Sequence, residues 1–117
     1  MCRFKLGVIF LFAAFGIAAC VSSKAQHYVI ADSKSYEASI FRQQCAICHG
    51  PEAEGKTLDN GTTVPSLREG EFKAKTDSEI YNQIANGGNG MTPFRSQLTE
   101  RELQLMTTFV RRDLRGQ

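Results

Sequence analysis

The chain has 117 residues, with 14 Lys and Arg against 12 Asp and Glu and a formal net charge of +2. This length is enough for one domain. From Cys20 onward the basic and acidic residues balance, and no long run of one charge occurs. We therefore expect neither nucleic acid nor an acidic membrane surface as a partner.

Residues 1–19 predict an export signal. Arg3 and Lys5 precede an apolar run from Leu6 to Ala19. This run is too short to span a membrane comfortably, and a basic start followed by such a run is typical of a signal peptide. The protein is therefore predicted to leave the cytoplasm.

Two processing sites follow the apolar run. Residues 17–20, Ile-Ala-Ala-Cys, resemble the lipobox of bacterial lipoproteins, so cleavage before Cys20 would leave a lipidated residue that tethers the protein to a membrane. Residues 23–25, Ser-Lys-Ala, form a small-x-small site, so cleavage after Ala25 would release the protein. Both alternatives predict a periplasmic protein, either soluble or lipid-anchored, in which residues 20–32 are a flexible segment or a tether.

The cysteines support this division of the chain. Cys2 lies in the signal and Cys20 is either removed or lipidated, so only Cys45 and Cys48 remain in the domain, which we place at residues 33–117. No structural disulfide is left to propose.

A helix is predicted from Asp32 or Ser33, as N-cap, through Cys48, because apolar residues recur along it with helical spacing. The two thiols of the domain therefore lie at the end of a helix.

Residues 45–49, Cys-Ala-Ile-Cys-His, carry the strongest chemical signal. Cys45 and Cys48 can each add to a vinyl group of haem, and His49 can reach the iron. A Cys45–Cys48 redox disulfide would need a βαβ context that is not found around it. A zinc site would need two further ligands, and the candidate His27 lies in the segment expected to be flexible.

The chain after the motif is predicted to be a long loop and then a short helix. Residues 51–65 are rich in Gly, Asn, Asp, Thr and Pro, which indicates an irregular loop. So long a loop is expected to be ordered if it folds over a large apolar cofactor. Residues 76–79, Thr-Asp-Ser-Glu, form a capping box that opens a helix of about ten residues, and this helix stops at residues 86–88, Asn-Gly-Gly.

A second loop and a last helix complete the chain. Glycine-rich residues 86–90 lead to residues 91–94, Met-Thr-Pro-Phe, which present an apolar residue just before a turn. Residues 99–102 form a second capping box, and the helix that it opens is amphipathic. No segment shows convincing strand alternation, so the predicted fold is all-α, with three to five short helices and long loops.

The order and spacing of these features resemble the class I c-type cytochromes, a family of small monohaem electron carriers, over about residues 33–115. The resemblance implies a cytochrome c-like fold wrapped around one haem c that is attached through Cys45 and Cys48. It also implies His49 as the proximal iron ligand and Met91 as the distal one.

Further residues match the family by position. Pro65-Ser66-Leu67 corresponds to a Pro-x-Leu element, which implies that the Pro65 carbonyl accepts a hydrogen bond from the His49 ring and that Leu67 packs on the haem. Phe94 is expected among the haem contacts. Met106 lies on the apolar face of the last helix, where it is expected to pack in the core.

Further resemblance concerns the contact between helices. Phe41, Met106 and Phe109 occupy the positions through which the first and last helices of the family pack against each other. The resemblance therefore implies that these two helices pack against each other.

The expected function is electron transfer without catalysis, because an iron held by both His49 and Met91 has no vacant site. The partners would be redox proteins such as a respiratory complex, a terminal oxidase or a periplasmic dehydrogenase, and the protein would be a monomer. Two alternatives remain. A haem without the Met91 ligand would be five-coordinate, as in a sensor or a peroxidase-like protein, and the domain could also be the electron-transfer subunit of a larger periplasmic oxidoreductase.

Overall fold

The computed structural model describes residues 27–117, so the predicted signal, both processing sites and Cys20 lie outside the described residues. Within residues 27–117, no helix has the length and apolar character needed to cross a membrane.

The first helical stretch is continuous and consists of α1 (Tyr36–Ile40), the π-helical turn η1 (Phe41–Cys45) and α2 (Ala46–His49). It begins at Ser35, whose side chain accepts a hydrogen bond from the backbone N–H of Ala38 at 3.2 Å. The helix predicted to end in the cysteine motif is therefore confirmed.

The chain ahead of α1 corrects two expectations. Asp32 lies in a turn and Ser33 follows it, so neither is the N-cap. Ile30 is fully buried, and the Tyr28 ring packs edge-on against Phe109 with ring centroids 5.3 Å apart. The part of the predicted flexible segment from Tyr28 onward is instead packed on the domain, because its apolar side chains find partners there.

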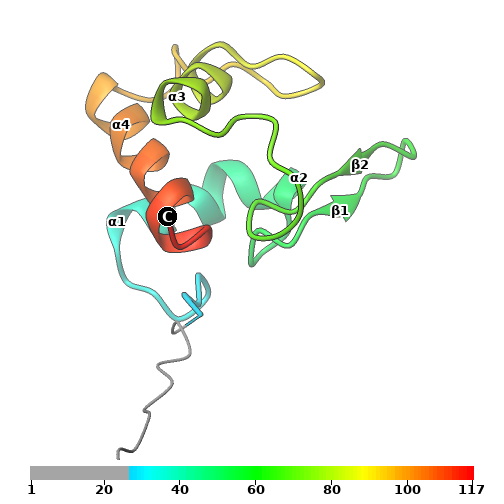
Figure 1. Ribbon diagram of the computed structural model, residues 1–117, viewed down its shortest axis with the longest axis horizontal. Coiled ribbons are helices and arrows are strands. Elements are labelled where there is room, and N and C mark those ends of the chain that lie inside the picture. The colour runs from blue at the N-terminus through cyan, green and yellow to red at the C-terminus, as the bar shows by residue number, and fades with distance from the viewer. Residues whose placement is uncertain (1–26) are drawn as a thin grey trace, which may run out of the picture.

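The loop after the motif contains a small hairpin that was not predicted. Strand β1 (Lys56–Thr57) pairs antiparallel with β2 (Thr63–Val64), and Lys56 lies opposite Val64. Each strand has two residues, which is too short to show an alternating pattern in the sequence. In Figure 1 the hairpin projects away from the helices.

Both predicted capping boxes are confirmed. Helix α3 (Asp77–Asn86) begins after Thr76, and α4 (Glu100–Thr108) begins after Thr99 and continues through the π-helical turn η2 (Phe109–Leu114). In each box the threonine hydroxyl accepts from a backbone N–H, while the glutamate three residues later accepts from the backbone N–H of the threonine.

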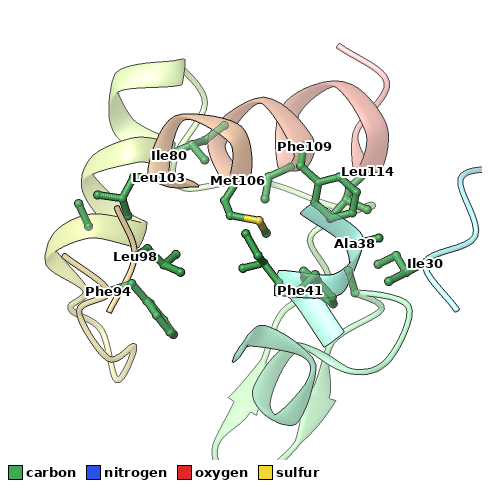
Figure 2. Packing of buried hydrophobic residues seen from close by; sticks show 14 residues of the cluster. Ile30, Ala38, Phe41, Ile80, Phe94, Leu98, Leu103, Met106, Phe109 and Leu114 are labelled. Atoms are coloured by element: carbon green, nitrogen blue, oxygen red, sulfur yellow. The ribbon is translucent and has the colours of Figure 1, made fainter. Parts of the chain in front are cut away.

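The core lies where the first and last helical stretches cross, as the family resemblance predicts. The rings of Phe41 and Phe109 lie 6.0 Å apart between centroids, and Ala38 is fully buried beside them. Figure 2 shows Met106 near the centre of this cluster, with Phe94 on one side. The fold is mostly helical with long loops, as predicted, and the hairpin departs from an all-α fold.

Candidate haem-binding site

The helices and loops enclose an apolar cavity. Its empty space, including the part that opens to solvent, is about 610 Å³. The walls come from η1, α2, the loop after β2, α3, the loop after α3, α4 and η2. The apolar side chains of these walls include Phe41, Leu67, Ile80, Ile84, Leu98 and Val110.

The cysteine motif forms one edge of this cavity. Cys45 is half-buried and lines it, whereas Cys48 is exposed and does not line it. Gly50 ends α2 with a φ of +85°, a backbone conformation that residues with a side chain rarely adopt. The sharp turn after the motif therefore depends on glycine, and it separates the motif from the loop that follows.

Cys45 does not have the character of a redox-active thiol. Both thiols are free, and burial, together with the neighbouring Cys48, raises the pKa of Cys45 to about 12. A nucleophilic or redox-active cysteine needs a lowered pKa instead. Residues 27–117 contain no group of three or more His, Cys, Asp and Glu side chains that could hold a metal ion, and His27 is exposed. The geometry thus favours haem attachment over either alternative.

His49 lines the cavity with a largely buried ring. Burial lowers the pKa of His49, which favours the neutral imidazole that ligates metals. Its Nδ1 atom is buried and has no hydrogen-bond partner among the described residues. A buried polar atom without a hydrogen-bond partner costs folding free energy, so the His49 ring has an unmet need for a partner that a bound group could supply.

The hydrogen bond expected between the His49 ring and the Pro65 carbonyl is not formed, since Nδ1 has no partner. Pro65 is exposed and does not line the cavity. The loop that carries it is instead held by a backbone hydrogen bond of 2.9 Å from Leu67 to Ala53. Leu67 itself lines the cavity.

Met91 reaches the cavity from the loop after α3. The backbones of Gly88 and Met91 exchange two hydrogen bonds of 3.0 Å, which close a tight turn. At Gly87, where φ is +66°, a Cβ atom would lie 2.4 Å from the Met91 carbonyl oxygen. The chain therefore needs glycine where it folds back on Met91, which explains the glycine-rich sequence.

Phe94 lies on the same wall. Its backbone N–H donates to the Ile84 carbonyl at 3.0 Å, and its side chain is 8% exposed and lines the cavity. The structure thus brings Met91 and Phe94 to the cavity that His49 and Cys45 line from the other helical stretch.

Two polar residues of the cavity were not predicted. Gln83 on α3 places its Nε2 atom 3.7 Å from Sδ of Met91 and also donates to the Gly88 carbonyl at 3.0 Å. Arg115, just after η2, lines the cavity as well. Gln83 lies three residues after Ile80 and just before Ile84, so it borders the apolar face of α3. This spacing could have predicted that Gln83 lies near the cavity.

This fold, the apolar cavity and the Cys-x-x-Cys-His edge define a c-type cytochrome. Two solved structures are similar. The c-type cytochrome KustC0563 has a TM-score of 0.55 and 28% identity, with 64% of this chain and 93% of that chain covered. Cytochrome CL from the marine methylotrophic bacterium Methylophaga aminisulfidivorans MPT has a TM-score of 0.52 and 30% identity, with 62% of this chain and 47% of that chain covered.

A family model described as cytochrome c oxidase, cbb3-type, subunit III matches residues 37–110, and the chain belongs to this family. The chain spans about half of the cytochrome CL chain. A comparison with curated proteins finds no match. As a small class I c-type cytochrome, the protein carries covalently bound haem c.

Proposed function

We propose that the protein is a one-electron carrier between periplasmic or membrane-bound redox proteins. Haem c would be attached through Cys45 and Cys48, with His49 and Met91 as the iron ligands. The observation that carries this proposal is that His49 and Met91 line one apolar cavity from two separate segments of the chain. Bound there, haem supplies an iron that changes between the ferrous and the ferric state.

The residues of the cavity suit electron transfer without substrate chemistry. A neutral His49 offers a nitrogen lone pair, and the Met91 thioether offers a soft sulfur ligand. With both sides of the iron occupied, no position remains for a substrate. Leu67 and Phe94 would contact the haem and exclude water, and an apolar surrounding disfavours the added positive charge of ferric iron. A comparatively high reduction potential follows.

The attachment edge also offers a route for electrons. Cys48 is exposed, and Ile47 beside it has 73% of its surface exposed. A haem held by Cys48 would therefore have an edge near solvent, where a redox partner can approach. Small and weak interfaces are typical of such transient contacts.

Export of the protein is part of the same proposal. The predicted signal and the sites at Cys20 and Ala25 support a periplasmic location, either as a soluble protein or as one anchored by lipid. Mass spectrometry of the mature N-terminus distinguishes the two, because an acylated Cys20 adds fatty-acid mass whereas cleavage after Ala25 leaves an unmodified Gln26.

A second candidate function is that of an electron-transfer subunit held permanently in a larger oxidoreductase. The description of the matching family, a subunit of a cbb3-type cytochrome c oxidase, supports this candidate. Purification from native membranes without crosslinking tests it: a stable, stoichiometric complex with an oxidoreductase favours the subunit, and an isolated cytochrome favours the free or tethered carrier.

The deciding experiment for the carrier is the visible spectrum of the holoprotein, recorded oxidised, reduced, and reduced with carbon monoxide. We expect a covalent low-spin haem that does not bind carbon monoxide. Met91→Leu should open the distal position and allow carbon monoxide to bind. Met106→Leu is the matched control, because Met106 also lines the cavity but is 2% exposed in the helix core.

Two results would overturn the proposal. Rapid binding of carbon monoxide to the wild-type protein would indicate an open site and favour a sensor or peroxidase-like protein. A loss of the low-spin spectrum in Met106→Leu but not in Met91→Leu would exchange the roles of the two methionines.

A further inference from the structure

Arg115 places a guanidinium group at the wall of the apolar cavity. Its Cζ atom lies 3.8 Å from the centroid of the Phe72 ring. Its Nε atom donates to the Leu67 carbonyl at 3.3 Å, and its Nη1 atom donates to the Ala74 carbonyl at 2.7 Å. Three contacts, all from the loop between β2 and α3, therefore hold the planar group in one orientation.

These contacts do not neutralise the charge. No ion pair joins Arg115 to any carboxylate of residues 27–117, and Nη2 has no hydrogen-bond acceptor among them. Burial and the nearby Arg111 lower the pKa of Arg115, but an arginine side chain remains protonated in proteins. Arg115 is only partly buried, so an anion can reach its free Nη2 edge and pair with the charge.

We propose that Arg115 binds a carboxylate of the group that fills the cavity, namely a propionate of haem c. This inference rests on the proposed function. A haem is largely apolar but carries two propionate carboxylates, and these must meet polar groups at the edge of an apolar cavity. Among the described residues that line this cavity, Arg115 is the one cation, since His49 is neutral and Gln83 is uncharged.

The chemistry of the guanidinium fits this ligand. Arginine presents N–H donors in a rigid fork that matches a carboxylate, and it pairs with carboxylates in buried sites more readily than lysine does. The free Nη2 edge can donate to the ligand while Nε and Nη1 keep their carbonyl acceptors. Arg115 is thus a positioning residue for the haem and not an iron ligand.

Loss of Arg115 should shift the redox equilibrium of the iron. Without the guanidinium, the negative propionate would be uncompensated and would favour the more positive ferric state. In Arg115→Met holoprotein we expect the equilibrium to shift about tenfold toward ferric iron, which lowers the midpoint potential by about 59 mV for one electron. Arg115→Lys should give a smaller shift, because lysine keeps the charge but loses the fork.

The test uses holoprotein made with a haem-attachment system, in the wild type and in the variants Arg115→Met, Arg115→Lys and Arg111→Met. Arg111 is the control: its substitution removes the same charge one turn earlier, its side chain is 38% exposed, and it pairs with Asp77 at 2.8 Å. Its removal should shift the redox equilibrium by less than about twofold, since surface charges are screened. Haem labelled with ¹³C at the propionate carboxyls allows the infrared carboxylate band to be assigned, and this band should move in both Arg115 variants.

The outcomes separate this inference from the proposed function. Failure of the wild-type protein to bind a covalent low-spin haem overturns the proposed function. A normal wild-type haem with the same potential and the same labelled carboxylate band in both Arg115 variants overturns only the propionate site. If Arg115→Met yields no holoprotein, Arg115→Lys still decides, because an unmoved band in that variant also contradicts the contact.

Discussion

Arg68 and Arg115 are two arginines withdrawn from solvent at different places in the fold, and their surroundings differ in one respect. The Arg68 side chain is 7% exposed and forms an ion pair with Glu52 at 3.2 Å. It also donates to the backbone carbonyls of Tyr28, at 2.8 Å, and of Glu52. Arg115 has two carbonyl acceptors and an aromatic ring, but no carboxylate. The first site is complete within the chain, whereas the second lacks its anion.

The site around Arg68 joins the segment ahead of α1 to the loop after the motif. The Glu52 carboxylate accepts from the backbone N–H groups of Ile30 and Ala31, each at 2.8 Å. Arg42 donates to the Ile30 carbonyl at 2.6 Å. We call these residues the N-terminal clamp. Since its charges and hydrogen bonds are satisfied by the protein, changes there should affect stability, and changes in the cavity should affect haem and potential.

The largest expected effect is the loss of cooperative folding when the cavity has no covalent haem. In Cys45→Ser/Cys48→Ser, made without haem, the apolar walls lack the surface against which they would pack. The net stability of a domain is only about 5–15 kcal/mol, so this loss should abolish a cooperative transition. Thermal unfolding followed by circular dichroism, with wild-type holoprotein as control, measures it. A cooperative transition like that of the holoprotein would mean that the cavity is stable without a ligand.

The next largest effect is expected in the N-terminal clamp. Glu52→Gln would leave Arg68 with carbonyl acceptors alone, as Arg115 is now. Removing one partner of a buried pair is strongly destabilising; because the Glu52 side chain is 31% exposed, we expect a loss of about 2–3 kcal/mol. Denaturant unfolding of the holoprotein measures this free energy.

A matched control is Asp77→Asn, which breaks an exposed pair with Arg111 and should cost less than about 1 kcal/mol. The midpoint potential should change in neither variant. A shift of the potential in Glu52→Gln, with unchanged stability, would contradict the separation between the clamp and the cavity.

Much of this fold was predictable because its signals are local. Each capping box is fixed by residues three positions apart, and the Cys-x-x-Cys-His motif is contiguous, so Thr76, Thr99 and the end of the first helical stretch were placed correctly. The contact between Phe41 and Phe109 was predicted only through the family resemblance, since the two residues are far apart in the sequence. Local patterns predict elements, whereas contacts between distant segments depend on tertiary packing.

The features that were not predicted depend on distant contacts. The fully buried Ile30 lies in a segment without periodicity, and its place is set by apolar packing in the core and by hydrogen bonds with Glu52 and Arg42. Arg115 follows a helix in which a basic residue is ordinarily solvated, so the sequence contains no signal that it faces a cavity. The interactions that decide these positions are contacts across the fold.

A smaller effect is expected at the start of α4. Thr99→Ala removes the hydroxyl that accepts from the Glu102 N–H at 3.3 Å, and this should cost about 1 kcal/mol. Thr108→Ala, an exposed position at the end of the same helix, is the control, and the potential should remain unchanged in both variants. If Thr99→Ala were as stable as the control, the box would contribute nothing.

The Thr99 effect should depend on pH. Hydrogen bonds from Tyr36 and then from the Thr99 backbone and hydroxyl lower the pKa of Glu102. A carboxylate whose pKa is lowered in the folded state stabilises the fold above its ordinary pKa of about 4.3 and loses this contribution as the pH falls below it. The cost of Thr99→Ala should therefore be smaller in acid than at pH 7, and denaturant unfolding at the two pH values measures the difference.

The smallest effect is expected at Gln83, and it should appear in the potential. Its Nε2 atom lies 3.7 Å from Sδ of Met91, and a donor there withdraws electron density from the sulfur that would ligate the iron. Gln83→Leu should make the thioether a better donor to ferric iron and shift the redox equilibrium about threefold toward that state, which is roughly 30 mV. Gln97→Leu is the control, because Gln97 is exposed and donates to the Pro93 carbonyl in the same loop. An unchanged potential in Gln83→Leu would show that Gln83 only holds the loop through its hydrogen bond to the Gly88 carbonyl. Of the two unpredicted polar residues of the cavity, Arg115 alone would then affect the potential of the iron.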